Sequence, residues 1–163
     1  LFLVGRLTEN IGGSQYAKAL QLIGGIVPRP DAKEAIAIHK AMHGAITAAT
    51  VRSCHDVSEG GLAVTIAEMA FAGGIGADIH GLNTLGNIPF AAMLFAEPPT
   101  CYVVEIEPQK VEQFQAIFKG LPVHEIGTAC VEKRLRFVGP TGEWALWTSL
   151  EDLRKAWLST LKF

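Results

Sequence analysis

The sequence lacks several features that would assign a chain of 163 residues to a special class of protein. Its three cysteines are odd in number and form no CxxC pair, which argues against a disulfide framework or a zinc site and favours reduced thiols in a cytoplasmic protein. No run reaches the ~18 apolar residues of a membrane span. The formal net charge is only −2, so the composition excludes a broad nucleic-acid or membrane-binding surface.

Signatures of the best-known nucleotide-binding proteins are also absent. The chain has neither the glycine-rich P-loop nor the dinucleotide-binding fingerprint. Its N-terminus carries no charged region ahead of an apolar one, so no secretory signal is predicted. The first residues, LFLVG, begin without methionine and read as the inside of a strand, and we therefore expect a piece of a larger protein. Residues 1–163 are long enough to bury a core and are expected to form a single domain.

What the chain does contain is a compact polar and glycine-rich run, CHDVSEGGL, at residues 54–62. An apolar pattern predicts a short strand at residues 51–55, which leads directly into this run. A pattern with helical periodicity predicts an amphipathic helix at residues 62–72, directly after it. Ligands commonly bind where a strand is followed by a helix, so the run lies where a binding site is expected.

The residue types in this run suit a phosphate and a metal ion. Gly60 and Gly61 let the backbone approach a ligand closely, and the positive N-terminal end of the following helix favours an anion. Asp56 offers a carboxylate to a hard cation, and Ser58 offers a hydroxyl to a phosphate oxygen. His55 is placed to hydrogen-bond a phosphate or to orient Asp56. The alternative is a capped helix start, in which these groups satisfy only the backbone.

Other polar residues are weaker candidates. Glu97 lies at the rim of an apolar segment, either as a site residue or as a charge at a strand entry. The GGS run at residues 12–14 forms either a second small anion site or a turn. His39 and His43 lie one helical turn apart, but no third metal ligand is evident in the sequence. A pair of surface or interface histidines is therefore the favoured interpretation.

The remaining periodicity predicts helices and strands in mixed order. Helices are expected at residues 15–22, 31–50 with Asp31 as N-cap, 88–93, 108–119 and 150–161. Strands are expected at residues 1–7, 75–79, 101–107, 122–131, 133–138 and 144–147. Ser149 and Asp152 predict a capping box for the last helix. Trp144, Trp147 and Trp157 are expected in the core or in helix packing. This order predicts an α/β (mixed α+β) fold, in which helices pack on a mixed β-sheet.

This succession of residues resembles the C-terminal domain of phosphoribosylformylglycinamidine synthase, within the wider aminoimidazole ribonucleotide synthase-like superfamily. The strongest match is HDVSEGGLA at residues 55–63, which continues to AEMA at residues 67–70. Further matching stretches follow the family's order: LVGR at 3–6 with GGS at 12–14, LFAE at 94–97, IG at 126–127 and SLEDLRKAW at 149–157. The resemblance therefore covers essentially the whole chain.

The resemblance implies a fold like the C-terminal domain of aminoimidazole ribonucleotide synthase, and a C-terminal fragment of a larger multi-domain enzyme. That enzyme is an ATP-dependent C–N ligase (amidotransferase) of purine biosynthesis, which converts formylglycinamide ribonucleotide and glutamine-derived ammonia to the amidine. ATP activates the amide oxygen by phosphorylation, and ammonia then displaces phosphate. The implied partners are the missing N-terminal domains and a glutaminase domain or subunit. The isolated fragment is expected to be inactive and to form a homodimer through its apolar surface.

The resemblance also implies roles for residues of the glycine-rich run. Asp56 would bind Mg²⁺, and Ser58 would bind a nucleotide phosphate together with His55, Gly60 and Gly61. In the large single-chain form of the enzyme, the half that corresponds to this domain holds a structural nucleotide. The implied nucleotide is therefore ATP or a structural ADP.

One departure from the family pattern concerns Cys101. Many relatives carry an arginine a few positions after the Phe-x-Glu segment, and Cys101 stands in its place, so any anion contact made by that arginine is lost. Two other interpretations stay open. The chain belongs to another superfamily enzyme, such as a hydrogenase-maturation dehydratase, a thiamine-monophosphate kinase or a selenophosphate synthase. Alternatively, it is a structural or dimerisation module whose loop binds nothing.

Overall fold

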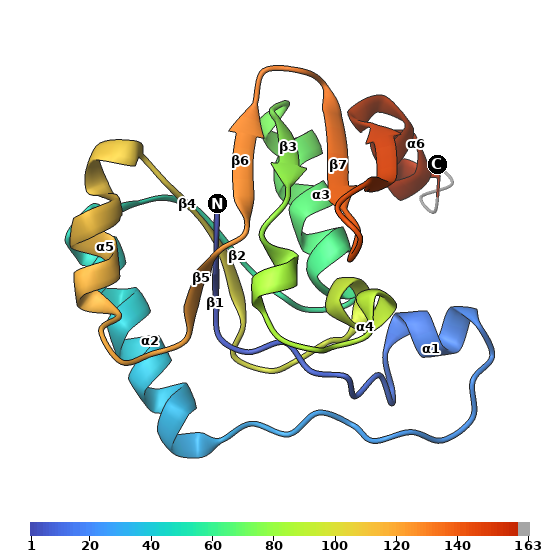
Figure 1. The fold of residues 1–163 in the computed structure, drawn as a ribbon, viewed down its shortest axis with the longest axis horizontal. Coiled ribbons are helices and arrows are strands. Elements are labelled where there is room, and N and C mark those ends of the chain that lie inside the picture. The colour runs from blue at the N-terminus through green and yellow to red at the C-terminus, as the bar shows by residue number, and fades with distance from the viewer. Residues whose placement is uncertain (160–163) are drawn as a thin grey trace.

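Residues 1–159 are described by the structure, a computed structural model, and they form two four-stranded β-sheets with helices between and around them (Figure 1). The α/β class expected from the sequence is confirmed. The strands divide between two sheets, whereas the periodicity by itself indicated only that a mixed sheet is present. Among the described helices, none has the length and apolarity needed to cross a bilayer.

All neighbouring strands of the first sheet run antiparallel. In spatial order the sheet consists of β2 (Val51–Asp56), β4 (Tyr102–Ile106), β1 (Phe2–Val4) and β5 (Val123–Glu125). Helices α2 (Ala32–Thr47) and α5 (Val111–Ile117) cover one face of it (Figure 1). The apolar side chains buried on this side are Phe2, Val4, Ile38, Met42, Ala45, Val104, Ile106, Phe114 and Phe118.

The second sheet is mixed, because β3 and β7 run parallel while its other neighbouring strands run antiparallel. Its spatial order is β6 (Gly127–Cys130), β3 (Gly76–Ile79), β7 (Arg134–Val138) and β8 (Trp144–Ser149). Helix α3 (Gly61–Gly73) joins this sheet to the first through one core, which includes Leu3, Val103, Leu62, Ile66, Ala77, Ile79, Leu135 and Phe137. Two further helices flank α3, namely α4 (Phe90–Phe95) and α6 (Leu150–Leu158).

The two sheets are separate because the strand expected at residues 122–131 bends at Ile126. Its first part forms β5 in one sheet, and its second part forms β6 in the other. The Ile126 side chain is fully buried, and its carbonyl accepts hydrogen bonds from the backbone N–H groups of His80 and Gly81 at 3.0 and 3.1 Å. The side chain is buried and the carbonyl is hydrogen-bonded to residues that follow β3. Together these contacts fix the bend at which the chain passes from one sheet to the other.

The helix boundaries follow their caps. Ser14 caps α1 (Gln15–Ala19), and the Asp31 carboxylate caps α2 by accepting from the N–H groups of Lys33 and Glu34. Ser149 caps α6 as expected, since its hydroxyl accepts from the Asp152 N–H at 3.1 Å. Short 3₁₀ turns occupy Leu82–Thr84 (η1) and Pro108–Lys110 (η2). The predicted extension of the last helix to Leu161 lies partly outside the described residues.

The expectation for the tryptophans is wrong in part. Trp144 and Trp147 are 47% and 64% exposed, because they project from the outer face of the edge strand β8. The Arg136 guanidinium lies 3.9 Å from the centre of the Trp144 ring. Trp157 does take part in helix packing, since its ring lies 5.7 Å from that of Phe71 between centroids. Which face of a sheet is left uncovered depends on what packs against it, and the periodicity of a short strand does not reveal this.

Candidate functional site

The predicted site run connects the end of β2 to the start of α3. We call residues 57–60 the site loop. Its first residue, Val57, is buried, and its N–H donates to the carbonyl of Cys101 at 2.8 Å, which ties the loop to β4. The Asp56 side chain is 65% exposed and Ser58 is exposed. The structure therefore presents the carboxylate and the hydroxyl to solvent, on either side of a buried anchor.

The two glycines of the run are required by the backbone. Gly60 and Gly61 have φ values of +86° and +73°, the left-handed region that glycine enters without a steric cost. A Cβ on Gly61 would lie 2.8 Å or less from the carbonyl oxygens of Leu94 and Ala96. The backbone that approaches Gly61 closely is therefore another segment of this chain, residues 94–96. Whether these glycines also approach a ligand stays a prediction.

Glu97 is the residue whose partners the sequence did not reveal. Its Oε1 atom accepts a hydrogen bond from the Gly60 N–H at 2.8 Å, and a second from the Gln15 N–H, also at 2.8 Å. The side-chain amide of Gln15 donates in turn to the Glu59 carboxylate at 3.3 Å. A carboxylate of the protein thus lies at the N-terminal end of α3, the position at which an anion is favoured. The Gly60 amide is already hydrogen-bonded.

His55 is held between β2 and α3. Its Nδ1 lies 2.8 Å from the backbone carbonyl oxygen of Asp56, and its Nε2 lies 3.4 Å from the Glu68 carboxylate. The Thr65 hydroxyl donates to the same Asp56 carbonyl at 3.2 Å. Glu68 and Thr65 were not among the predicted site residues, although both lie on the helix that the sequence places after the loop. Nδ1 of His55 also lies 3.4 Å from the Asp56 carboxylate, so His55 orients a side chain that stays 65% exposed.

A second histidine and a tyrosine lie on the other side of Asp56. Asp56 is paired with Tyr102 across β2 and β4, and the Tyr102 hydroxyl lies 2.8 Å from Nδ1 of His39 on α2. Burial and, secondarily, the negative charges of Cys54 and Asp56 raise the pKa of Tyr102. The phenol is therefore a neutral hydrogen-bonding group near the carboxylate at physiological pH.

The donor set fits Mg²⁺ in one arrangement only. Within residues 1–159 no group of three His, Cys, Asp or Glu side chains is placed to hold a metal ion. Asp56 is a single, exposed carboxylate. Mg²⁺ is commonly bound through one or two carboxylates while water and substrate phosphates supply the other ligands. The chain therefore suits a Mg²⁺ carried with a phosphate, not one enclosed by protein alone.

The GGS run at residues 12–14 forms a turn and a helix cap. The Gly12 N–H donates to the carbonyl of Ile26 at 3.0 Å. The Ser14 hydroxyl donates to the Ile11 carbonyl at 2.7 Å and accepts from the Ala17 N–H at 3.1 Å. These contacts use polar groups that an anion would need, so the structure favours the turn over the anion site.

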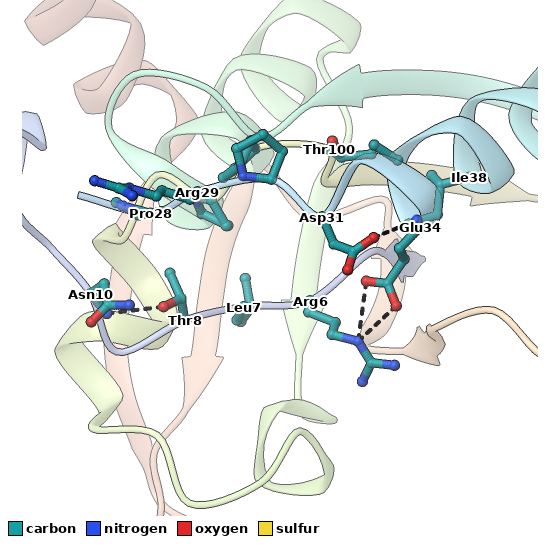
Figure 2. Close-up of a pocket in the computed structure, with 14 residues that line it drawn as sticks. Arg6, Leu7, Thr8, Asn10, Pro28, Arg29, Asp31, Glu34, Ile38 and Thr100 are labelled. Atoms are coloured by element: carbon teal, nitrogen blue, oxygen red, sulfur yellow. Dashed lines mark hydrogen bonds and ion pairs between the residues drawn. The ribbon is translucent and has the colours of Figure 1, made fainter. Parts of the chain in front are cut away.

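A cavity of about 220 Å³ is lined in part by Pro98, Pro99 and Thr100, which follow Glu97 in the chain (Figure 2). Two of its lining residues, Arg6 and Glu34, meet in an ion pair in which Nε lies 3.1 Å from the carboxylate (Figure 2). Arg29 and Asp31 also line it, so its charges are balanced. Neither Asp56 nor Ser58 is among the described residues that line this cavity, so the cavity is separate from the predicted site run.

A known family matches most of this sequence. The family described as "AIR synthase related protein, C-terminal domain" matches residues 1–139. The chain belongs to this family. This is the superfamily that the sequence resemblance indicated, so the expected fold and superfamily are confirmed by the match.

Curated relatives are the phosphoribosylformylglycinamidine synthase subunits PurL of several microorganisms. The subunit of Lactobacillus helveticus is 34% identical over 99% of this chain, and that of Thermococcus kodakarensis is 34% identical over 94%. The matches cover 21% and 20% of those proteins, so the chain spans about a fifth of the length of its curated relatives.

Solved structures share the fold at low sequence identity. Thermotoga maritima PurL complexed with FGAR has a TM-score of 0.74 and 15% identity, with 93% of this chain and 27% of that chain covered. The hydrogenase maturation protein HypE in complex with ATP has a TM-score of 0.63 and 13% identity, with 93% of this chain and 51% of that chain covered. These likenesses show that the fold of this chain also occurs in larger proteins.

Cys101, the departure from the family pattern noted in the sequence, is buried. Its Sγ lies 3.1 Å from the Arg6 carbonyl, and burial raises the pKa of its thiol to about 12. The side chain is therefore a neutral packing group that offers no anion contact.

Proposed function

We propose that the chain is the C-terminal domain of a phosphoribosylformylglycinamidine synthase of the PurL type. The whole enzyme would be an ATP-dependent C–N ligase of purine biosynthesis, which converts formylglycinamide ribonucleotide and glutamine-derived ammonia to the amidine. The support is the match to PurL subunits over 99% of the chain, at 34% identity in the Lactobacillus helveticus protein. A cytoplasmic location is part of this proposal, since the cysteines are free thiols in residues 1–159.

The single observation that carries a role in nucleotide binding is the geometry at the end of β2. Asp56 and Ser58 are exposed next to the N-terminal end of α3, while His55, Thr65 and Cys101 hold the backbone between them. A carboxylate and a hydroxyl held on a rigid strand end are suited to a Mg²⁺-bound phosphate. Ser58 would contact a phosphate oxygen, and Asp56 would face the metal ion.

The residues of this domain would bind and orient, and the chemistry would come from the nucleotide. When bound, Mg²⁺ would neutralise phosphate charge beside Asp56. ATP would phosphorylate the amide oxygen of the substrate, after which ammonia displaces phosphate. His55 and Gly61 would support the loop, and the amide of Gly60 would reach a ligand only if Glu97 gave up its hydrogen bond. The bound nucleotide would be ATP or a structural ADP.

The proposed partners follow from the relatives. The Thermotoga maritima PurL structures include complexes with ATP, with ADP and with FGAR. By analogy, the missing four-fifths of a PurL-sized protein would supply the N-terminal domains that complete the nucleotide site. A glutaminase domain or subunit would supply ammonia. In the absence of these partners, a homodimer of the chain would cover part of its exposed apolar surface.

Calorimetry with Mg²⁺ and ATP or ADP tests the nucleotide site. Asp56→Ala is expected to weaken binding at least roughly tenfold, since it removes the charge that faces the metal ion. Glu112→Gln, which removes an exposed carboxylate from α5, is the matched control and should leave binding unchanged. Binding that is absent in the chain but depends on Asp56 in the full-length parent would indicate a composite site. If Asp56→Ala changes nucleotide binding in neither protein, the loop serves only as the start of a helix.

A second candidate is an ATP-binding domain of the HypE kind. It is favoured by the HypE match, in which this chain corresponds to about half of the solved protein. An ATPase assay on the full-length parent separates the two, because stimulation by formylglycinamide ribonucleotide is expected only for the synthase.

A further inference from the structure

An arm of the chain lies beside the site loop. We define the arm as residues 11–27, which contain α1 and a loop that runs along one edge of the molecule toward α2 (Figure 1). Its base is closed by the hydrogen bond from the Gly12 N–H to the Ile26 carbonyl. A Cβ on Gly12 would lie 2.7 Å from the Ile26 carbonyl carbon, so the two ends of the arm are in close backbone contact. The arm is therefore one closed unit.

The outer part of the arm has little to hold it in place. Residues 18–27 are all exposed. The large apolar side chains among them are Leu20, Leu22, Ile23, Ile26 and Val27, each at least half exposed. An exposed segment without burial is not fixed by the hydrophobic effect. The position of the arm must therefore be set at its inner end, around α1.

The inner end rests on the segment that precedes β4. The Tyr16 ring stacks on Phe95 with parallel planes and 5.1 Å between centroids. Two residues further on, Oε1 of Glu97 accepts the Gln15 N–H of the arm and the Gly60 N–H of the site loop. The same segment packs against Gly61 through the carbonyls of Leu94 and Ala96. One short segment thus supports both the arm and the site loop.

We propose that Glu97 is a positioning residue that holds the arm and the site loop in one fixed arrangement. A single carboxylate oxygen bonds two backbone amides that are far apart in the chain, one at the start of α1 and one at the cap of α3. The negative charge is stabilised there because both amides are at N-terminal helix ends. The assignment of what is positioned, a nucleotide-binding loop, rests on the proposed function. The link between the two segments does not.

Two consequences follow for a ligand at the site loop. With Glu97 in place, a phosphate is directed to the Ser58 side of the loop, because the Gly60 amide already has an acceptor. The loop is also preorganised, so a ligand does not have to order it on binding. Loss of Glu97 should therefore weaken nucleotide binding, although Glu97 itself is negatively charged and would repel a phosphate.

Hydrogen exchange in the 163-residue chain tests the link directly. Glu97→Ala is expected to speed exchange of the Gln15 and Gly60 amides together, by roughly tenfold, because both lose their acceptor. Glu97→Gln retains an acceptor oxygen and should restore most of the protection. Glu59→Gln, which touches only the Gln15 side chain, is the matched control and should leave both backbone amides unchanged. Unchanged exchange at the core amide of Val104 verifies that each variant is folded.

The outcomes are distinct. Faster exchange at Gly60 without a change at Gln15, or no change at either, would overturn the proposal. Titration with Mg²⁺ and ADP is a second measurement. Weaker binding by Glu97→Ala supports the positioning role. Tighter binding would mean that Glu97 competes with phosphate, and it would also overturn the proposal. If the unsubstituted chain and its full-length parent bind no nucleotide, the proposed function fails, and the exchange measurements still decide the link.

Discussion

At the scale of single residues, the polar groups around the site loop divide into those that the protein uses itself and those that it leaves open. The amides of Val57, Gly60 and Gly61 are hydrogen-bonded within the chain, to Cys101, Glu97 and Ser58 respectively. The Asp56 carboxylate is exposed. A ligand would therefore be recognised by side chains of this loop more than by the amides of its glycines.

Gly61 is the glycine next to the site loop whose added Cβ would collide with backbone atoms of a distant segment. Gly61→Ala is expected to lower the free energy of unfolding by roughly 3 kcal/mol, because the left-handed backbone and the collision with the Leu94 and Ala96 carbonyls both oppose a Cβ. The control is Gly120→Ala, which has a similar φ of +83° but no atom within 4 Å of the added Cβ. Its expected cost is about 1 kcal/mol. Equal costs in urea unfolding would show that close approach at Gly61 is unimportant.

At the scale of elements, one carboxylate links side chains of the parallel pair β3–β7 in addition to its backbone pairing. Asp78 on β3 accepts hydrogen bonds from Arg136 at 2.7 and 2.8 Å, and it also pairs with Arg134. Both arginines lie on β7, two residues apart and on the same face of the sheet. The Arg136 hydrogen bonds, with those of Arg134, hold the pKa of Asp78 well below its usual range.

Asp78→Asn is expected to destabilise the fold at neutral pH, and the effect should depend on pH. Because the pKa of Asp78 is lowered in the folded state, its stabilisation is complete above about pH 4, the ordinary value for aspartate in an unfolded chain. The stabilisation is lost as the pH falls further, toward the pKa of the folded state. Thermal unfolding of both proteins between pH 7 and pH 3 measures this. Glu132→Gln, whose carboxylate is 4.0 Å from Arg134 and largely exposed, should have little effect.

A difference between Asp78→Asn and the unsubstituted chain that stays constant down to pH 3 would contradict this account. It would mean that packing of the side chain, and not its charge, holds β3 and β7 together.

At the scale of the whole molecule, the chain is a folded domain that matches only part of the length of its relatives. It has two sheets and a shared core around α3, yet it spans only about a fifth of its curated relatives. Its candidate site offers one carboxylate and one hydroxyl at an exposed loop, without a cluster of metal ligands in the described residues. Under the proposed function, groups from outside the chain would complete such a site.

The isolated chain is therefore expected to form no amidine from formylglycinamide ribonucleotide, ammonia and ATP. Measurement of product by chromatography, with the full-length parent as positive control, tests this. Turnover by the chain alone would show that the described residues contain a complete active site, and the account of a composite site would be wrong.

Much of the local structure could be predicted from the sequence. The N-caps Ser149 and Asp31 and the strand that leads to Asp56 occur where expected. Caps and turns depend on residues within a few positions of one another, so a local pattern contains the necessary information. The predicted site residues His55, Asp56 and Ser58 are adjacent in sequence, and their closeness in space needed no fold to establish it.

Contacts between distant segments could not be predicted in this way. The exposed position of Trp144 and Trp147 depends on the outer face of their sheet being uncovered there, and the break at Ile126 depends on two sheets meeting at one residue. In each case the residue type is compatible with the alternative, because aromatic and β-branched residues suit either face of a strand.

The sequence by itself determined the α/β class, the helix caps and the chemistry of the loop from His55 to Gly61, since these follow from periodicity and from neighbouring residues. Only the tertiary structure decided what Glu97 does. Its two amide partners lie 82 and 37 positions away in the chain. No local pattern specifies such pairings, because they form only when β1, β2 and β4 have assembled and brought the ends of their connecting segments together.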